Sequence, residues 1–509
     1  MFERASRQPG ESALTDPSGQ LTWRDAADRV TSLAAALRRL DFPDGSRLAV
    51  VGHNCSDTVL AYASAARAGI GAIRVNHHQT AGEIEHLLRD GRARAVWASS
   101  ELLAIAADAA ARCGIPMVAA GMNSRHWRSL VPGEAWLPPP SDLPAATNLI
   151  YTSATTGTAK GIEVPHAPVN TVSEGLAAMR QHHLAGLGPH LAVGPLYHAG
   201  PHAAVGLLLT GTPLVVAGRF DAARIIDAIE HHRIATSVMV PTHFVRLLAL
   251  PEKRRRESDV SSIRRIALTG SSCPIQVYKA MLDWFGPVFR EAYGASESGT
   301  VSFITSQEWI THQGSVGRSQ PPFRFLILDA EGAPCPPGRQ GTIYIVDDTG
   351  RGIRYYNDPA KTAAAHRAPG TFTLGDVGYL DEEGYLYVTG RVTDMVISGG
   401  VNIYPAECQR VLTSHPSVRN AALFGVPDDE MGERLVGIVS LQPDGTTPED
   451  LLAFCQDKIA RYKVPKELLA VAEIPTTPMG KLDKRALRQA YLDGSFGSAR
   501  RHGGGGAAT

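Results

Sequence analysis

The 509-residue sequence contains few cysteines, no long apolar run and no net charge. Its six cysteines never occur with Cys-x-x-Cys spacing, so we expect reduced thiols and no disulfide framework. No stretch approaches the roughly 18 apolar residues of a membrane-spanning helix. Lys plus Arg (50) balance Asp plus Glu (50), so the global charge gives no reason to expect binding to nucleic acid or to an anionic membrane.

The N-terminal segment MFERASRQPGESALT carries charges where a signal peptide requires an apolar core. We therefore expect a cytoplasmic protein with no transmembrane segment. The composition, 44% hydrophobic and 20% charged, is typical of globular proteins. At about 150 residues per domain, the length allows roughly two to four domains.

Short apolar runs alternate with helix-like segments between 47 and 120. The runs RLAVV, AIRV, ARAVWA and PMVAA are interspersed with SDTVLAYASAARA and AGEIEHLLRD, a pattern that predicts βα units on a mainly parallel sheet. A second series, HLAVGPL, TPLVVAG, ATSVMVP and IRRIALTG, has a helical pattern after each run. The sequence therefore predicts the α/β class, with two α/β layered subdomains.

After about residue 300 the pattern changes to strands and turns. The segment VGYLDEEGYLYVTGR predicts a hairpin with Glu383 and Gly384 in its turn, within a small β-barrel-like part. From Thr393 onward, the predicted strands NAALFGVPDD and LVGIVSLQPD and the helix PEDLLAFCQDKIARY indicate an α+β unit. We expect a large N-terminal domain over 1–391, a small C-terminal domain over 392–493 and a flexible Gly-rich tail over 494–509.

The segment YTSATTGTAKG, residues 151–161, combines six hydroxyl side chains with glycines and one lysine. Hydroxyls, backbone amides freed by glycine and an ammonium group together suit the oxygens of a polyphosphate. A P-loop would require Ser or Thr after Lys160, where this chain has Gly161. A polyphosphate loop of another kind and a polar linker both remain open from these residues alone.

The histidines give weaker signals. The adjacent pairs His182–His183 and His231–His232 cannot direct both rings at one metal from a helix, so we predict no metal cluster there. His243, in VPTHFVRLL, suits core packing and substrate contact equally well.

The hydroxyl-rich loop is followed by further segments in an order that resembles one known family. They are PLYHAGP, LTGSSCP, EAYGASESG, LGDVGYLDEEGYLYVTGR, SGGVNIYPAE and PTTPMGKLDKR. Over nearly the whole chain this resembles the adenylate-forming (AMP-binding) superfamily, with an acyl-CoA synthetase or aryl-CoA ligase type of organisation. The chain departs from the family pattern at Ala154, Ala159, Ser296 and Thr393.

The resemblance implies roles for individual residues. The catalytic residues would be Lys481, Glu297 and Lys160, with Glu297 also the magnesium ligand. The ATP-binding set would be Thr152, Ser153, Thr155, Thr156, Gly157, Lys160, Ser271, Ser272, Glu291, Tyr293, Gly294, Ser296, Asp376, Arg391 and Lys481. The acid would contact His198, His243, Gly270 and Ser271, CoA would pass Gly399 and Gly400, and the hinge of a mobile C-terminal domain would be Thr393.

These roles imply an ATP-dependent ligase that adenylates a fatty or aromatic carboxylic acid and transfers the acyl group to CoA. The implied cofactors and co-substrates are ATP, Mg²⁺ and CoA. The expected partners are a small-molecule acid, with an acyl carrier protein or a second copy in a homodimer as open possibilities, and no nucleic acid. Three alternatives stay open: an acyl-AMP ligase that loads a carrier protein, a diazotase that activates nitrite for an aryl amine, and a catalytically silent nucleotide-binding relative.

Overall fold

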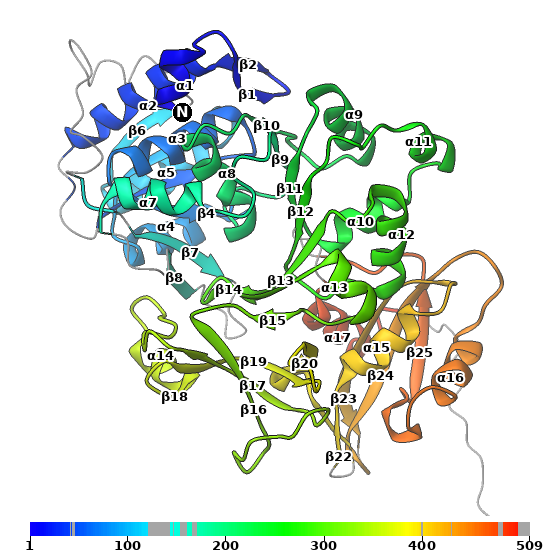
Figure 1. Ribbon diagram of the computed structural model, residues 1–509. Coiled ribbons are helices and arrows are strands. Elements are labelled where there is room, and N and C mark those ends of the chain that lie inside the picture. The colour runs from blue at the N-terminus through cyan, green and yellow to red at the C-terminus, as the bar shows by residue number, and fades with distance from the viewer. Residues whose placement is uncertain are drawn as a thin grey trace, which may run out of the picture.

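The computed structural model describes residues 1–40, 42, 46–120, 143–145, 147–152, 160–164, 170–398, 401–428, 430–476 and 482–496 (Figure 1). Four sheets and the helices around them form the described structure. The helices are α1 Phe2–Arg7, α2 Trp23–Arg38, α3 Ser56–Arg67, α4 Ala81–Asp90, α5 Leu103–Cys113, α7 Val172–Arg180, α8 Ala199–Leu209, α9 Ala222–His232, α10 Pro241–Leu248, α11 Glu252–Glu257, α12 Ile275–Phe285, α13 Ser306–Thr311, α14 Pro359–Ala365, α15 Pro405–Thr413, α16 Pro448–Gln456 and α17 Lys484–Leu492.

The first sheet has the strand order β6-β5-β3-β4-β7-β8. Its strands are β3 Arg47–Val51, β4 Gly71–Val75, β5 Ala93–Ala98, β6 Met117–Ala120, β7 Asn148–Thr152 and β8 Lys160–Val164. All neighbours pair in parallel except β7 and β8, which are antiparallel. The predicted βα units over 47–120 are confirmed, because β3 to β6 fall on the four apolar runs.

The second sheet has nine strands in the order β15-β14-β13-β12-β11-β9-β10-β1-β2. Its strands are β1 Ser12–Asp16, β2 Gly19–Thr22, β9 His190–Ala192, β10 Leu214–Val216, β11 Thr236–Met239, β12 Arg265–Leu268, β13 Phe289–Ala295, β14 Gly299–Thr305 and β15 Arg318–Ser319. The second predicted series is confirmed as β9 to β12. Unexpectedly, β1 near the N-terminus pairs in parallel with β10, which joins the start of the chain to this sheet.

The helices α2, α3 and α8 pack between these two sheets and bury the main core. Trp23 of α2 and Trp97 of β5 are both fully buried in this cluster. A second core lies under the helices of the second sheet and includes Phe244, Tyr278 and Phe289. Burial of such large side chains supplies most of the stabilisation of a fold of this size.

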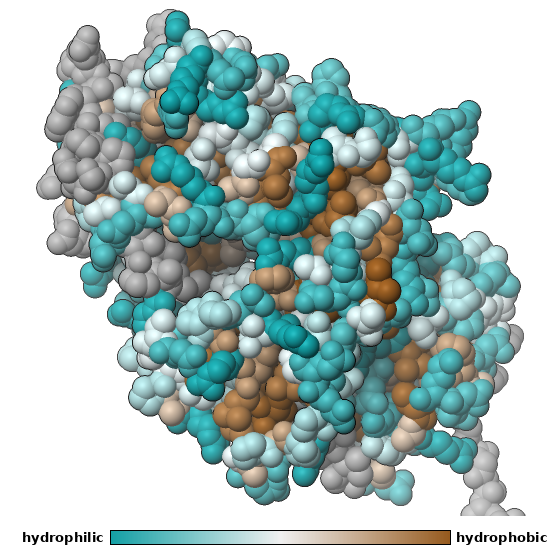
Figure 2. All heavy atoms as spheres, viewed as in Figure 1, coloured by the Kyte–Doolittle hydropathy of each residue, from teal (hydrophilic) through white to brown (hydrophobic). Residues whose placement is uncertain are grey.

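The third sheet is antiparallel and consists of β16 Phe323–Leu328, β17 Gly341–Asp347, β18 His366–Ala368, β19 Thr371–Leu380 and β20 Leu386–Arg391. The predicted hairpin is confirmed, since β19 pairs with β20 and Gly384 has a φ of 81° in the turn. Hydrophobic side chains gather over this sheet on the face in Figure 2, where most other areas are hydrophilic.

The fourth sheet lies in the C-terminal part and consists of β21 Val396–Ser398, β22 Val401–Ile403, β23 Val418–Asp428, β24 Gly432–Leu441 and β25 Glu467–Val471. The helices α15 and α16 cover one hydrophobic cluster and α17 contributes to another, which confirms the predicted α+β character. The overall α/β architecture, with a large N-terminal and a small C-terminal part, agrees with the sequence prediction. The exact domain boundaries at 391 and 493 stay predictions.

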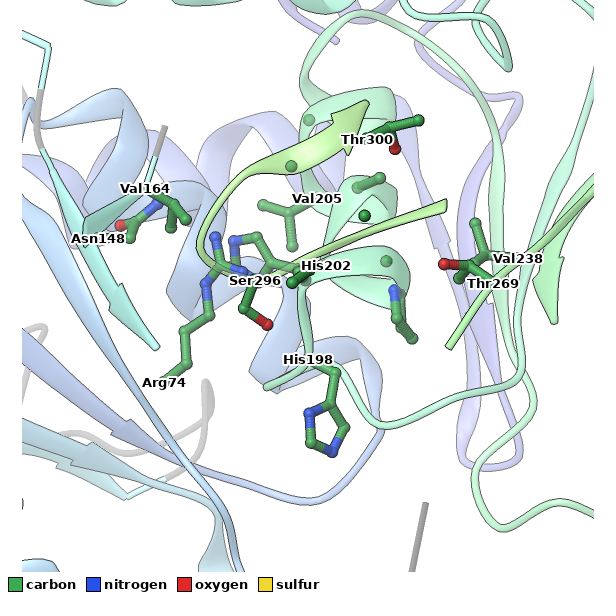
Figure 3. A pocket seen from close by; sticks show the side chains of 18 of the residues that line it. Arg74, Asn148, Val164, His198, His202, Val205, Val238, Thr269, Ser296 and Thr300 are labelled. Carbon is green, nitrogen blue, oxygen red and sulfur yellow. The ribbon is translucent and has the colours of Figure 1, made fainter. Parts of the chain in front are cut away.

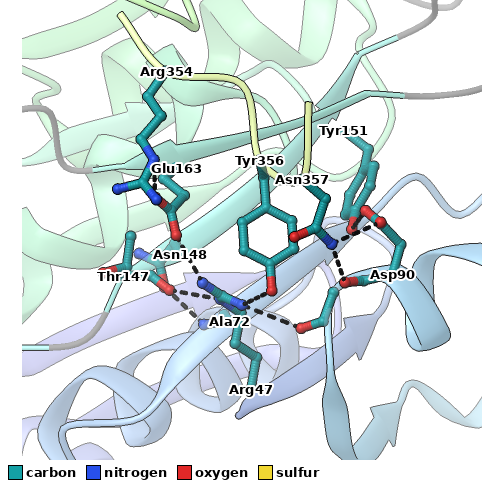
Figure 4. Close-up of polar contacts among 11 residues, drawn as sticks. Arg47, Ala72, Asp90, Thr147, Asn148, Tyr151, Glu163, Arg354, Tyr356 and Asn357 are labelled. Atoms are coloured by element: carbon teal, nitrogen blue, oxygen red, sulfur yellow. Dashed lines mark hydrogen bonds and ion pairs between the residues drawn. The ribbon is translucent and has the colours of Figure 1, made fainter. Parts of the chain in front are cut away.

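A buried arginine ties the first sheet to the loop before α14 (Figure 4). Arg47 contacts Glu163 Oε1 at 3.2 Å from Nη2, and its guanidinium lies 4.8 Å from the centre of the Tyr356 ring. The next residue of the loop, Asn357, donates from Nδ2 to Asp90 Oδ1 at 3.0 Å. These contacts hold the segment that contains Tyr355, a residue that lines the cavity of the molecule.

Candidate active site

A cavity of about 1090 Å³ opens where strands of the second sheet reach their carboxyl ends. The segments that follow β9, β11 and β12 line it with Gly194, Val240 and Gly270. Ligands of α/β proteins bind at this edge of a parallel sheet, because loops and helix starts converge there. The fold therefore places a ligand-sized space at the position where α/β folds carry their sites.

One face of the first sheet forms another wall of the cavity. Arg74 of β4, Asn148 of β7, and Lys160 and Val164 of β8 all line it. Ile150 pairs with both Arg74 and Ile162, so these three side chains lie on one face of the sheet. Asn148, Lys160 and Val164 lie on the same face, because each is two residues from Ile150 or Ile162 in its strand. Lys160, expected to be the charge of the polyphosphate loop, thus borders the cavity.

Glu297 lies in the turn after β13 and lines the cavity beside two lysines. The Tyr355 hydroxyl donates to Glu297 Oε1 at 3.3 Å, and Lys361 Nζ lies 3.6 Å from the centre of the Tyr355 ring. Burial and the nearby charge of Lys160 lower the pKa of Lys361. Two ammonium groups and one carboxylate therefore share this end, which suits an anionic ligand with a bound cation.

Asp376 of β19 is buried between two partners. Tyr293 donates its hydroxyl to Oδ2 at 2.8 Å, and Arg391 donates from Nε to Oδ1 at 3.0 Å. The pairing of Asp376 with Arg391 across β19 and β20 brings the second pair together. Each carboxylate oxygen has two lone pairs, so Asp376 retains acceptor capacity for a vicinal diol.

Histidines form much of the remaining polar wall, and His182, His183, His198, His202 and His243 all line the cavity. Burial lowers the pKa of His243 to about 4 and that of His183 to about 3, so both rings are neutral near pH 7. The His243 ring also stacks on Phe220, with ring centroids 4.4 Å apart. His243 is thus packed against the core and also lines the cavity, and its contact with a substrate stays a prediction.

Part of the cavity wall is apolar. It is formed by side chains of α7 and α8, namely Leu176, Met179, Val205 and Leu209. A wall that combines cationic and apolar side chains fits a ligand that has an anionic group and a hydrocarbon body.

The structure places the other predicted site residues as follows. Gly294, Ser296 and Gly270 line the cavity, whereas Ser271 and Ser272 are exposed and, like Glu291, are not among its described lining residues. Ser153, Thr155, Thr156, Gly157, Gly399, Gly400 and Lys481 lie outside the described residues, as do the side chains of Thr152 and Thr393.

Glu291 is buried on the side of β13 away from the cavity. Burial raises the pKa of its carboxyl group to about 8, although the Cys273 backbone N–H stabilises the charged form. A carboxyl group with this pKa is largely neutral at pH 7. Its side chain is buried in the protein, and the expected contact of Glu291 with ATP stays a prediction.

Several residues that border the cavity were not predicted from the sequence, among them Arg74, Tyr355 and Lys361. Arg74 had a signal, since it interrupts the buried apolar strand GAIRV. Tyr355 and Lys361 had none, because they reach the cavity through the long-range contacts of their loop with Arg47 and Asp90.

Models of two known domain families match this chain. The model of the AMP-binding enzyme family matches residues 1–349, and the model of the AMP-binding enzyme C-terminal domain matches residues 407–481. The chain belongs to the AMP-binding enzyme family. The predicted resemblance to adenylate-forming enzymes is thereby confirmed.

Individual relatives extend over almost the whole chain of this AMP-binding enzyme. It is 30% identical to a feruloyl-CoA synthase from Amycolatopsis, with 96% of this chain and 97% of the relative covered. It is also 30% identical to an indoleacetate–CoA ligase from Aromatoleum aromaticum, with 97% of each covered. Among solved structures, the amide bond synthetase McbA from Marinactinospora thermotolerans superimposes with a TM-score of 0.81 at 26% identity, covering 96% of this chain and 99% of McbA.

Two absences apply to the described part of this AMP-binding enzyme. There, no helix combines the length and apolar character needed to cross a membrane. Nor do three or more His, Cys, Asp or Glu side chains gather there in a way that could hold a metal ion by themselves. A cation at Glu297 would therefore take its other ligands from a substrate and from water, as Mg²⁺ does with nucleotides.

Proposed function

We propose that this protein is an AMP-forming ligase that adenylates a carboxylic acid with ATP and then transfers the acyl group to CoA. The two relatives named above, a feruloyl-CoA synthase and an indoleacetate–CoA ligase, support this reaction type. The observation that carries the proposal is one cavity whose wall includes both the charged side chains of Lys160, Lys361 and Glu297 and apolar side chains of α7 and α8. Such a cavity suits an organic acid beside a triphosphate.

In the first half reaction, the carboxylate of the acid attacks the α-phosphorus of ATP, the bond to the β-phosphate oxygen breaks, and pyrophosphate leaves. Both reactants are anions, so the protein must offset their repulsion and hold them in line. Lys160 and Lys361 neutralise phosphate oxygens, together with the hydroxyl-rich loop over 151–161. Asp376 accepts hydrogen bonds from the ribose, with Tyr293 and Arg391 holding its carboxylate in place.

Glu297 is the proposed protein ligand for Mg²⁺. A single carboxylate with a hydrogen bond from Tyr355 leaves coordination sites for phosphate oxygens and water. When bound, Mg²⁺ would neutralise charge on the phosphates as pyrophosphate leaves.

In the second half reaction, the CoA thiol attacks the acyl carbonyl, and AMP leaves with the electrons of the acyl–oxygen bond. We propose that the C-terminal domain, 392–493, turns about Thr393 between the two steps. It would bring Lys481 to the acid for adenylation, and Gly399 and Gly400 to the pantetheine arm for transfer. Two successive glycines allow a backbone to lie close to a narrow chain.

A screen of pyrophosphate release tests the proposal. Wild-type protein with ATP and Mg²⁺ should release pyrophosphate with particular fatty or aromatic acids, and CoA should then give a thioester and AMP. Parallel reactions replace CoA with a phosphopantetheinyl carrier protein, or replace the acid and CoA with nitrite and an aryl amine. Turnover only with the carrier or only with nitrite would reassign the acceptor or the reaction, and no turnover with any of these would contradict the ligase.

A further inference from the structure

Arg74 is a charged side chain of the cavity wall that the mechanism above does not use. Arg74 of β4 is only 7% exposed, and no described residue forms a hydrogen bond or an ion pair with its guanidinium. Burial lowers its pKa only to about 10, so the group is still charged near pH 7. An unpaired buried charge is costly, and a protein retains one mainly where a ligand completes the pair.

The charges around the cavity do not compensate Arg74. Glu297 is the one acidic residue among the described lining residues, against the basic residues Arg67, Arg74, Lys160, Lys361 and Arg391. Glu297 lies at the end shared by Lys160 and Lys361. ATP would supply anionic oxygens for that end, so an excess positive charge remains at Arg74.

The neighbours of Arg74 are polar but neutral. The guanidinium lies beside the His202 ring (Figure 3), and burial followed by the charge of Arg74 lowers the pKa of His202 well below its usual range. The Nδ1 atom of His202 lies 3.1 Å from the Leu196 carbonyl oxygen. Because a carbonyl oxygen only accepts hydrogen bonds, Nδ1 carries the proton of the neutral ring. Asn148 accepts from the Ala72 backbone N–H at 2.8 Å through Oδ1, which leaves its Nδ2 group as a second donor on the cavity wall.

Arg74 and Lys160 are separate points on the same wall. Arg74 pairs with Ile150 of β7, and Lys160 pairs with Thr152, two residues further along β7. Arg74 and Lys160 are therefore separated by two strand spacings across the sheet and by two residues along the strands. Their Cα atoms lie roughly 12 Å apart. Both side chains point to the same face, so one ligand with two anionic groups can engage both ends.

From this geometry we propose that the acid substrate is a dicarboxylate, whose second carboxylate binds the Arg74 guanidinium and the Asn148 amide while the first is adenylated near Lys160 and Glu297. The proposal rests on the proposed ligase function and narrows its substrate class. A guanidinium presents two parallel N–H donors that match a carboxylate. The apolar side chains of α7 and α8 would cover the hydrocarbon between the two groups.

The test compares matched probes on matched variants. The probes are glutarate, adipate, isophthalate and terephthalate, each paired with its monoamide, which keeps the size and removes one charge. The variants are Arg74→Met, which keeps an unbranched apolar stem but removes the guanidinium, Arg74→Lys, and Arg94→Met as a control at an exposed arginine of β5. Binding is measured without ATP by thermal shift and calorimetry, and turnover by pyrophosphate release.

We expect at least one diacid to bind wild type more tightly than its monoamide and to lose about 100-fold in affinity and in kcat/KM in Arg74→Met. Arg74→Lys should recover part of the loss, and Arg94→Met should match wild type. The KM for ATP should not change, and removal of an unpaired buried charge should not lower the melting temperature of Arg74→Met.

Three results would overturn the proposal. They are equal loss for diacid and monoamide in Arg74→Met, a raised KM for ATP in that variant, and no diacid that prefers wild type over Arg74→Met. The binding arm separates this proposal from the ligase itself. Arg74-dependent diacid binding without turnover would contradict the ligase alone, whereas turnover of monocarboxylates independent of Arg74 would contradict the dicarboxylate alone.

Discussion

The Tyr293 hydroxyl donates to Asp376 Oδ2 at 2.8 Å, and this bond joins β13 of the second sheet to β19 of the third sheet. Arg391 holds the other oxygen, so the carboxylate is fixed from both sides before any ligand arrives. A pre-oriented acceptor loses little conformational freedom when it binds a ribose diol. We therefore expect the hydrogen bond from Tyr293 to Asp376 to contribute to ATP binding.

Tyr293→Phe should raise the KM for ATP about 5-fold, because loss of one hydrogen bond of about 1 kcal/mol lets the Asp376 carboxylate move. Asp376→Ala should raise it far more, since the diol then loses its acceptor. Initial rates at varied ATP concentration measure both variants. Equal effects of the two substitutions would mean that Tyr293 contacts the nucleotide itself in addition to Asp376.

Glu291→Gln should change how stability depends on pH. Burial raises the folded-state pKa of Glu291 to about 8 from an ordinary 4.5, so folding favours the protonated form. Its contribution to the free energy of unfolding is fully present below pH 4.5 and is lost as the pH rises through about 8. Glu291→Gln, which is always neutral, should therefore be more stable than wild type at pH 8.5 by about 4 kcal/mol and show no such advantage at pH 4.5.

Urea unfolding at the two pH values measures this difference. Parallel stability curves for wild type and Glu291→Gln would contradict a buried, protonated carboxyl group. A lower stability of the variant at both values would instead show that Glu291 makes contacts that glutamine cannot replace.

Arg47→Met should destabilise the protein by about 3 kcal/mol, because it leaves Glu163 and two backbone carbonyls near Arg47 without their donor. Arg354→Met is the matched control, since Arg354 also faces Glu163, at 3.8 Å, but its side chain is 80% exposed. The control should cost less than about 0.5 kcal/mol. Denaturant unfolding measures the free energy of unfolding of both variants. Similar losses in both would contradict a larger contribution to stability from the buried contacts of Arg47 in Figure 4.

Glu297→Gln should lower kcat at least about 100-fold and shift the Mg²⁺ dependence of pyrophosphate release to higher concentrations. The amide oxygen is a weaker ligand than a carboxylate for a hard cation. Tyr355→Phe removes one hydrogen bond to Glu297 and should reduce kcat only a few-fold. An unaltered Mg²⁺ dependence in Glu297→Gln would remove Glu297 from the metal site.

Alternation of apolar runs with helical patterns was enough to predict β3 to β6, β9 to β12 and the hairpin of β19 and β20. These elements have strong local signals, because buried parallel strands read as continuous apolar runs. The pairing of β1 with β10 had no such signal, because it joins residues 200 positions apart. Local pattern does not specify which of two sheets a short N-terminal strand joins.

Motif order similarly located Lys160, Glu297, Ser296 and His198 on one cavity. Glu291, expected to bind ATP, is not among the described lining residues, because strand alternation turns that side chain away from the wall that Ala292 forms. Tyr355 and Lys361 could not be predicted, since their place depends on contacts of the loop after β17 with Arg47 and Asp90. The structure thus adds the residues that arrive through tertiary contacts.

Adenylation of a carboxylic acid moves one carboxylate oxygen of the acid to AMP, so following that oxygen tests the proposed reaction. The best substrate from the acid screens, labelled with ¹⁸O in its carboxylate, is incubated with wild-type protein, ATP, Mg²⁺ and CoA. We expect one ¹⁸O atom in AMP for each thioester formed, and acid-dependent exchange of pyrophosphate into ATP without CoA. Appearance of the label in inorganic phosphate together with ADP, or thioester formation with unlabelled AMP, would contradict the proposed reaction.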